Sequence, residues 1–371
     1  MRRIAIGTWV ALLAACASSE DPKASPAPTP VAEGGVNDAG TNEASVSDAG
    51  ATPDGAARDL FPDTCAPGAF CPVSISLGAQ QSMLSISARS ESDIWVTGSL
   101  GAVVHFDGTA WSSVRMPLRE TFGAVLARSG DETWLGSSMR AVYTNRAPDA
   151  GPSSWTTIAS SLTPYALRDL WSAPGSARVW AALEEQSQPT TLFRLEVRDD
   201  VLTATPINGI AFNVAMNALD GISKDELWAV GDLGGAYRIT AAESETPLVE
   251  RFDTHTNNSL NGVSVLSGDD IWAVGTVGTV RRYRGPTIGW ERVDVPVTNH
   301  LNAIAAVAPD DVWVVGDGAT ILHYDGSTWS TVAIAGLQGV RPRLRAVTVL
   351  PGRIVVAGER SILELRTAKG S

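Results

Sequence analysis

The sequence is poor in the residues from which metal, thiol and nucleic-acid sites are commonly built. Its 371 residues include only four histidines and three cysteines, and its 28 basic residues form no run. Forty acidic residues bring the net charge to −12, which argues against a nucleic-acid partner. No nucleophile-elbow, zinc-protease, phosphate-loop or dinucleotide-binding motif is present. We therefore expect no cofactor, no resident metal and no nucleic acid.

The N-terminus lacks a hydrophobic run long enough to cross a bilayer. About a dozen mostly apolar residues, 4–15, follow Arg2 and Arg3, whereas a spanning helix needs ~20. A basic start before a short apolar core predicts a signal peptide over residues 1–15. The segment ends in Leu-Ala-Ala before Cys16, which resembles the lipobox of bacterial lipoproteins. The alternative is a plain signal peptide followed by a coincidental cysteine.

The lipobox resemblance implies a lipid anchor. In lipoproteins of this kind the residue equivalent to Cys16 becomes the first mature residue and carries diacylglycerol and an N-acyl chain such as palmitate. Several acyl chains hold a protein on a membrane far better than one, because each buried CH₂ adds ~0.8 kcal/mol. No aspartate follows Cys16, since the next residue is Ala17. The resemblance therefore implies sorting to the outer membrane.

The next segment lacks large apolar side chains. Residues 16–60 consist mainly of Ala, Pro, Ser, Gly, Asp and Thr after the lipidated cysteine, a composition that predicts a disordered tether. Cys65 and Cys71 then flank a Pro-Gly turn in an exported chain, which predicts a local disulfide. We expect this bridge to staple residues 61–81, the approach to the first repeat.

Residues 82–367 repeat one pattern. A complete copy has an apolar strand, an acid two residues before tryptophan, a W-x-V-G strand, a glycine turn, an aromatic-Asp-Gly turn and a second tryptophan, and the middle and last copies are degraded. The clearest copy is 301–332, and the second-strand position recurs at 95, 134, 180, 228, 272, 313 and 355. Steps of 39 to 48 residues predict four-stranded propeller blades. We expect an all-β, seven-bladed propeller with antiparallel blades, or six blades if a degraded middle copy is not one.

The last copy stops after its third strand. An unassigned β-rich segment, residues 72–77, precedes the first copy. Supplying the missing outer strand from this segment would close the ring and remove exposed strand edges. We therefore predict closure by an N-terminal strand.

The motifs W-[AV]-V-G and H-[FY]-D-G-x-x-W resemble the Asp-box (BNR-like) repeats of sialidase-like and photosystem-assembly propellers, and the propeller repeats of exported bacterial lipoproteins. The Asp-Gly pairs at Asp107 and Asp325 are one residue shorter than the full box, so the match is partial. The resemblance implies a propeller fold and leaves the function open.

The repeated residues have expected structural roles. Second-strand tryptophans should pack between blades: Trp95, Trp134, Trp180, Trp228, Trp272 and Trp313. Glycines that end these strands should permit the turn or a close approach: Gly98, Gly231, Gly275 and Gly316. The acids before the tryptophans should bond turn amides, with a calcium site as the alternative: Asp93, Glu132, Glu226, Asp270 and Asp311. His105 and His323 occupy equivalent positions and should be packing residues rather than catalytic ones.

A polar position recurs eleven residues before the second-strand tryptophan, near the start of the first strand. It reads Leu84, Gly123, Asn217, Asn261 and Asn302, with Arg168 and Arg345 near the same place in irregular copies. First strands line the axis of a propeller, so the asparagines and arginines form a candidate ligand-binding ring. The alternative is that each asparagine caps a strand end and binds water.

These patterns predict a membrane-anchored, non-enzymatic propeller scaffold that binds a protein or glycan in the cell envelope. The resemblance to sialidase-like propellers offers an alternative, a glycan-acting hydrolase or lyase. Such enzymes use an arginine cluster, acidic groups and a tyrosine at the channel. Arg168 and Arg345 fit that pattern, but no recurrent tyrosine or obvious acid pair accompanies them.

Overall fold

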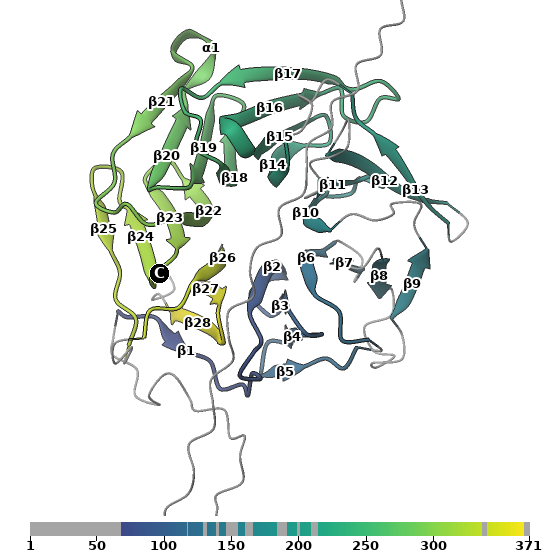
Figure 1. The fold of residues 1–371 in the computed structure, drawn as a ribbon, viewed down its shortest axis with the longest axis vertical. Coiled ribbons are helices and arrows are strands. Elements are labelled where there is room, and N and C mark those ends of the chain that lie inside the picture. Colours follow the sequence, from purple (N-terminus) through teal and green to yellow (C-terminus); the bar gives the residue numbers. More distant parts are fainter. Residues whose placement is uncertain are drawn as a thin grey trace, which may run out of the picture. The chain divides into compact units, whose positions relative to one another are not determined.

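Seven small antiparallel sheets surround a common axis, and the chain passes once around the ring (Figure 1). The computed structural model describes residues 68–116, 118–128, 132–138, 141–145, 155–159, 166–183, 191–198, 201–208, 214–335 and 340–366. Each sheet has four strands. The predicted seven-bladed β-propeller is confirmed, and the six-bladed alternative is wrong.

Each blade is built from the axis outwards. The inner strands are β2 (Met83–Ser90), β6 (Phe122–Ala127), β10 (Leu167–Trp171), β14 (Met216–Ser223), β18 (Leu260–Ser267), β22 (Leu301–Ala308) and β26 (Leu344–Leu350). The second strands are β3 (Asp93–Gly98), β7 (Thr133–Ser137), β11 (Val179–Leu183), β15 (Glu226–Gly231), β19 (Asp270–Gly275), β23 (Asp311–Gly316) and β27 (Arg353–Gly358).

The third strands are β4 (Val103–Phe106), β8 (Ala141–Asn145), β12 (Leu192–Arg198), β16 (Gly235–Thr240), β20 (Thr279–Tyr283), β24 (Thr320–Tyr324) and β28 (Ser361–Arg366). The outer strands are β5 (Trp111–Ser113), β9 (Thr156–Ala159), β13 (Val201–Pro206), β17 (Leu248–Asp253), β21 (Trp290–Val293), β25 (Trp329–Thr331) and β1 (Cys71–Pro72). Two short helices, η3 (Asp232–Gly234) and α1 (Gly285–Ile288), lie in connecting turns. Within these described segments no helix is long and apolar enough to cross a membrane.

An N-terminal segment closes the ring, as predicted, but its strand is shorter than expected. Residues 72–77 were predicted as the closing strand, whereas β1 contains only Cys71 and Pro72, paired antiparallel with β28. Phe70 makes an additional parallel bridge to Ile334. One further backbone hydrogen bond follows, from the amide of Val73 to the carbonyl of Ile362 at 3.0 Å, before the chain leaves β28 on its way to the first inner strand. Cys16 and Cys65 lie outside the described residues, so the signal peptide, lipid anchor, tether and disulfide stay predictions.

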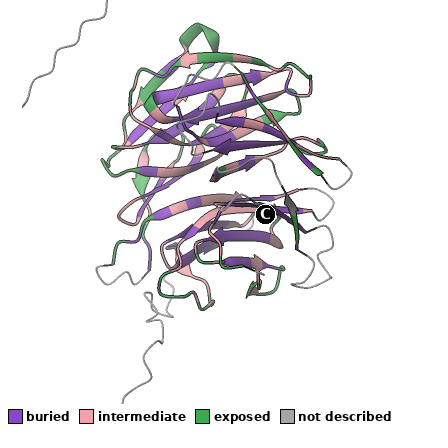
Figure 2. Cartoon of the chain, turned by 45° about the vertical axis from the view of Figure 1, so that its right-hand side comes forward, coloured by how far each residue is buried: buried purple, intermediate pink, exposed green. Residues whose placement is uncertain are grey.

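The core consists of seven clusters, one between each pair of neighbouring blades. Second strands are buried on both faces because one face packs on the preceding blade and the other on the following blade, which explains their unbroken apolar runs. Figure 2 shows buried residues along the strands and exposed residues at the connecting loops. The six second-strand tryptophans are at most 6% exposed.

A recurring aromatic pair joins neighbouring blades. The outer-strand tryptophan of one blade packs edge-on against the second-strand tryptophan of the preceding blade. The pairs are Trp155–Trp95 at 5.8 Å, Trp290–Trp228 at 5.8 Å and Trp329–Trp272 at 5.9 Å between ring centroids. Phe70 takes this position in the last blade and packs against Trp313 at 5.9 Å. The closing segment therefore contributes an aromatic anchor as well as a short strand.

The glycines that end second strands face the neighbouring loop at close range. A Cβ atom at Gly231 or Gly275 would collide with a backbone carbonyl, that of Ala215 or Ser259 respectively. Equivalent collisions await Gly98 and Gly316. A side chain at this position would force the second strand away from the start of the inner strand.

We predict that the aromatic pairs carry a large share of the stability. Trp290→Ala removes a ring that is 2% exposed and packed on Trp228, so unfolding free energy should fall by ~3–5 kcal/mol. Trp111 occupies the same repeat position but has no tryptophan opposite it, because the preceding blade carries Val355 there. Trp111→Ala should therefore cost distinctly less in urea unfolding. Equal losses in the two variants would contradict a special role for the pairs.

Candidate functional site

The candidate ring residues are the bulges of the seven inner strands. In every blade the pairing of inner and second strands shifts by one residue near the start of the inner strand. The extra residues are Leu84, Gly123, Arg168, Asn217, Asn261, Asn302 and Arg345. A bulge redirects the side chain of its extra residue. The seven therefore sit at one face of the disc, where the inner strands begin, which we call the leading face.

The three asparagines bind the next blade. Asn217, Asn261 and Asn302 each donate an Nδ2 hydrogen bond to the backbone carbonyl of the first residue of the following inner strand. The acceptors are Leu260 at 2.9 Å, Leu301 at 2.9 Å and Leu344 at 2.7 Å. The amide nitrogen of each asparagine is therefore engaged between blades. A role in ligand contact stays a prediction, and for Asn261 and Asn302 it would fall to the side-chain carbonyl oxygen.

Charged groups surround these asparagines in two short networks. Arg168 donates to Asn217 Oδ1 at 3.2 Å, and Asn217 Nδ2 also donates to Asp232 Oδ1 at 3.1 Å. Asn302 Nδ2 likewise donates to Asp317 Oδ1 at 2.8 Å. Asp232 and Asp317 were not selected from the sequence. Each directly follows the glycine that ends a second strand, and this shared repeat position could have identified both aspartates in the sequence.

Short side chains on the inner strands connect consecutive blades further along. Ser85 and Ser87 accept hydrogen bonds from the amides of Val125 and Ala127, and Ser264 accepts one from Ala306. Aspartates do the same between the middle blades: Asp169 Oδ2 accepts from Leu219 N at 2.8 Å, and Asp220 Oδ2 from Val265 N at 2.7 Å. Inner-strand amides that face the neighbouring blade are satisfied by these oxygens.

The two aspartates have perturbed acidities. Burial, with the nearby charge of Asp220 as a smaller contribution, raises the pKa of Asp169 to about 7. Burial also raises the pKa of Asp220 to about 6, against hydrogen bonds donated by Val265, Gly221 and Trp171. A perturbed carboxyl pair is a recognised feature of catalytic sites. Here, however, both oxygens of each aspartate accept backbone amides, which is a structural arrangement.

The acids before the tryptophans do not bond turn amides, so that prediction is wrong. Each begins or adjoins a second strand and pairs with a donor inside the blade. Asp311 accepts from Trp313 Nε1 at 2.7 Å and lies 2.9 Å from His323 Nε2. Asp93 does the same with Trp95 and His105. Elsewhere the donor is arginine: Arg128 for Glu132, Arg238 for Glu226 and Arg282 for Asp270.

The two equivalent histidines belong to these structural units. His105 stacks on Trp95 at 4.0 Å and His323 on Trp313 at 4.1 Å between ring centroids. Their ring nitrogens face the aspartates rather than a cavity. Among the residues that the structure describes, no group of three or more His, Cys, Asp or Glu could hold a metal ion.

The turns between second and third strands place apolar side chains on the leading face in a strained conformation. Leu100, Leu233 and Val277 have φ values of 56°, 55° and 56°, in the left-handed region. They are 46%, 61% and 59% exposed. Asparagine or glycine is favoured at such turn positions, and a β-branched residue there is an outlier. Three blades therefore tolerate strain and show an apolar side chain to solvent.

Neighbouring segments hold these turns in place. The amide of Gly278, next to Val277, donates to the carbonyl of Asn299 at 2.8 Å. Thr254 Oγ1 donates to the carbonyl of Gly234, next to Leu233, at 2.8 Å. The strain is therefore maintained by the frame, and the apolar side chains are pre-positioned. Strained residues of this kind cluster at binding sites.

The raised pKa values of Asp169 and Asp220 predict that the protein loses stability as pH rises from 5 to 8. Raised folded-state pKa values mean that folding favours the protonated carboxyls, so their contribution disappears as pH passes through about 6 and 7. For Asp169 the loss should be about 2–3 kcal/mol over this range. Asp169→Asn should flatten the dependence in urea unfolding at several pH values. A parallel pH profile in wild type and variant would contradict it.

The comparisons with known proteins agree on the fold alone. No family model and no curated protein matches the sequence. Among solved structures, YCF48 bound to D1 peptide is 18% identical with a TM-score of 0.60, covering 83% of this chain and all of that one. Virginiamycin B lyase from Staphylococcus aureus is 14% identical with a TM-score of 0.63, covering 77% and 95%. The WD40 propeller of Doa1 is 11% identical with a TM-score of 0.62, covering 80% and 96%. The chain is therefore similar in fold to several β-propellers, of which one is described with a bound peptide and another is a lyase.

Proposed function

We propose that this protein is an exported, lipid-anchored propeller that binds a polypeptide partner in the cell envelope without catalysis. The observation that carries the proposal is the set of exposed, strained apolar turn residues on the leading face, Leu100, Leu233 and Val277. Holding such residues in the left-handed region costs roughly 1–2 kcal/mol each. A contact made outside the chain would explain their retention, since their exposed side chains gain little from folding.

Charge supports the choice of this face. Exposed arginines lie on it, among them Arg168 at the bulge ring and Arg343 beside the last inner strand, although the chain as a whole carries a net charge of −12. An arginine side chain can bind a carboxylate while its stem covers apolar surface. The partner segment we propose therefore combines apolar side chains with carboxylates. A glycan partner fits less well, because the protruding turn side chains are aliphatic.

The anchor and the address belong to the same proposal. We propose that residues 1–15 direct export and that Cys16 is lipidated at the outer membrane. The propeller would then lie at the end of a long tether, with a disulfide between Cys65 and Cys71 at its base. Tethering raises the effective concentration of a binding surface for envelope partners. A weak apolar contact on the leading face would then suffice. That YCF48 is described in complex with D1 peptide supports polypeptide recognition by a propeller of this kind.

The hydrolase or lyase alternative has less support. Its best residues are Asp169 and Asp220, which have raised pKa values and lie near Arg168. General acid–base catalysis needs an oxygen within reach of the substrate. The hydrogen bonds that these carboxylates accept from backbone amides instead suit a structural role. We therefore propose binding without catalysis.

Replacing the three turn residues should separate stability from binding. In a variant with Leu100→Asn, Leu233→Asn and Val277→Asn, asparagine accepts the left-handed conformation, so the melting temperature should rise, with a gain of ~0.4–1 kcal/mol per site. Photocrosslinking from position 257, an exposed leading-face residue, should lose its partner adducts. The adducts are measured in envelope preparations, and the melting temperature is measured on the purified protein.

A matched control uses Leu248→Asn, on the opposite face. Leu248 is 66% exposed but lacks the left-handed conformation, so this change should leave both melting temperature and crosslinking unchanged. Asp225 is also exposed on the opposite face. Any adduct formed by a crosslinker at this position should persist in the triple variant. If the triple variant keeps every adduct, the leading face is not the binding surface.

The anchor can be tested separately. Cys16→Ser removes the acyl attachment point, and the protein should move from the membrane fraction to the soluble fraction of lysed envelopes. Cys71→Ser is the control and should stay with membranes, since it affects only the disulfide. Persistence of the Cys16→Ser variant in the membrane fraction after a high-salt wash would contradict lipid anchoring.

A further inference from the structure

The aromatic pair that joins neighbouring blades is incomplete where the ring closes. Four interfaces contain two facing rings, as in Trp290–Trp228. At the seam between the last and first blades, Trp111 supplies the outer-strand ring, but Val355 stands where the second-strand tryptophan would be. Valine lacks the indole that would pack against Trp111. The seam therefore has one half of an aromatic pair.

The cross-strand partner at the seam also differs in chemistry. Second-strand tryptophans Trp95, Trp272 and Trp313 face His105, Arg282 and His323, which stack on the indole. Val355 instead faces Glu364. The Glu364 carboxylate pairs with Arg353 Nε at 3.2 Å and Arg366 Nε at 2.8 Å.

Arginine partly compensates for the missing ring. The Arg353 guanidinium lies 4.2 Å from the ring centroid of Phe106 in the first blade. Arg353 thus covers the inner part of the seam. Partly buried side chains of the closing segment, Val73 and Ile75, pack against the same seam cluster as Trp111, and neither supplies an aromatic ring.

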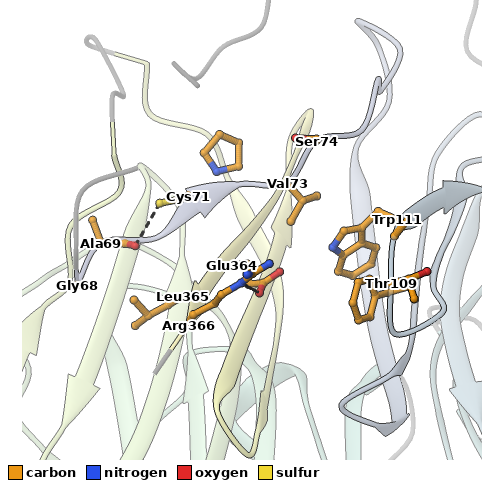
Figure 3. Close-up of a pocket in the computed structure, with 13 residues that line it drawn as sticks. Gly68, Ala69, Cys71, Val73, Ser74, Thr109, Trp111, Glu364, Leu365 and Arg366 are labelled. Carbon is orange, nitrogen blue, oxygen red and sulfur yellow. Dashed lines mark hydrogen bonds and ion pairs between the residues drawn. The ribbon is translucent and has the colours of Figure 1, made fainter. Parts of the chain in front are cut away.

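A cavity of about 680 Å³ lies at this place. Figure 3 shows Thr109 and Trp111 on one side, facing Glu364, Leu365 and Arg366 on the other, with the closing segment around Val73 and Ser74 forming a further wall. Its volume is within the ~300–1,000 Å³ of small-ligand sites. Its position matches the repeat geometry, because the two residues that flank the indole elsewhere, the cross-strand partner and the next outer-strand tryptophan, both line it.

We infer that the seam cavity binds an aromatic side chain presented by a partner polypeptide, which completes the aromatic pair with Trp111. Trp111 offers an apolar ring for edge-on or offset packing. Glu364 and Arg366 offer a carboxylate and a guanidinium for a polar edge, such as an indole N–H or a phenol hydroxyl. The partner is the polypeptide of the proposed function, so the inference rests on that proposal for where the aromatic ring comes from. The chemistry of the cavity does not depend on it.

The molecule contains a precedent for a ring supplied from a distant segment. Phe70 comes from the N-terminal approach, outside the repeats, and packs against Trp313 as outer-strand tryptophans do elsewhere. Beyond Phe70, the described pairing of β1 with β28 ends at Glu364, so Leu365 and Arg366 extend past it along the cavity. An extended segment that carries an aromatic residue therefore has both a backbone edge and a ring position to occupy.

The test measures binding of N-acetyl-tryptophanamide to the full chain carrying Cys16→Ser, by calorimetry and ligand-observed NMR. N-acetyl-leucinamide is the non-aromatic control. We expect millimolar affinity for the tryptophan probe and at least tenfold weaker binding of the leucine probe. Equal binding of the two probes, or no tryptophan binding up to its solubility limit, would overturn the inference.

Two variants locate the site. Ser74→Trp fills the cavity from an exposed position and should weaken probe binding at least tenfold, whereas Ser76→Trp, exposed two residues later and outside the cavity lining, should not. Val355→Trp restores the repeat indole and should both raise the melting temperature and abolish binding. Unchanged binding in Ser74→Trp overturns the inference even if Val355→Trp fails to fold.

The source of the aromatic ring is separated by two further readouts. Phe61 precedes Cys65 in the N-terminal approach to the first repeat. Tryptophan-probe binding that emerges only in a Phe61→Ser variant would assign the cavity to this side chain of the same chain and overturn a partner. In an envelope crosslinking experiment, Ser74→Trp should remove the adducts formed at the seam. The leading-face adducts at position 257 should persist. Retention of position-257 adducts in the triple turn variant, with normal tryptophan-probe binding, would contradict the leading-face proposal while the seam cavity still binds an aromatic ring.

Discussion

The structure depends on satisfying the inner strands, whose amides face a neighbouring blade rather than a hydrogen-bonded strand. Buried backbone groups left unpaired cost free energy comparable to a lost hydrogen bond. Serines such as Ser264 and the aspartates Asp169 and Asp220 accept these amides, while bulge asparagines such as Asn302 donate to the next carbonyl. The aromatic pairs then fill the space farther out. Closure follows, because each blade is complete only with a neighbour.

The fold could be predicted because its information is periodic. A second-strand position that recurs at blade-length intervals, occupied by tryptophan in six copies and by Val355 in the last, identified all seven sheets, and the incomplete last copy indicated closure by an N-terminal strand. The length of that strand could not be predicted. Residues 72–77 have suitable composition, but the path to Met83 limits the paired strand to Cys71 and Pro72, with one further hydrogen bond from Val73. Local propensity describes what a segment can do, and the geometry of the ring decides how much of it pairs.

The candidate site was predictable in position but not in chemistry. Counting back from each tryptophan located the bulge ring, yet the sequence could not show that the Asn217 amide reaches the carbonyl of Leu260, because that acceptor is backbone in another blade. The acids failed for a related reason. Asp311 before a strand suggests a turn bond, whereas the antiparallel register brings His323 and the Trp313 indole to the same carboxylate. Cross-strand and cross-blade partners are invisible to local motifs.

Departures from the repeat are therefore the informative positions. Where the repeat is obeyed, as at Trp228 or Gly275, packing explains the residue. Val277 in a left-handed turn and Val355 in place of an indole break the pattern in opposite ways, one adding an apolar side chain outside and the other removing one inside. Neither improves the isolated fold, since the first is strained and the second leaves Trp111 without a ring opposite it. Both departures become understandable if surfaces that the chain leaves incomplete are completed by another molecule.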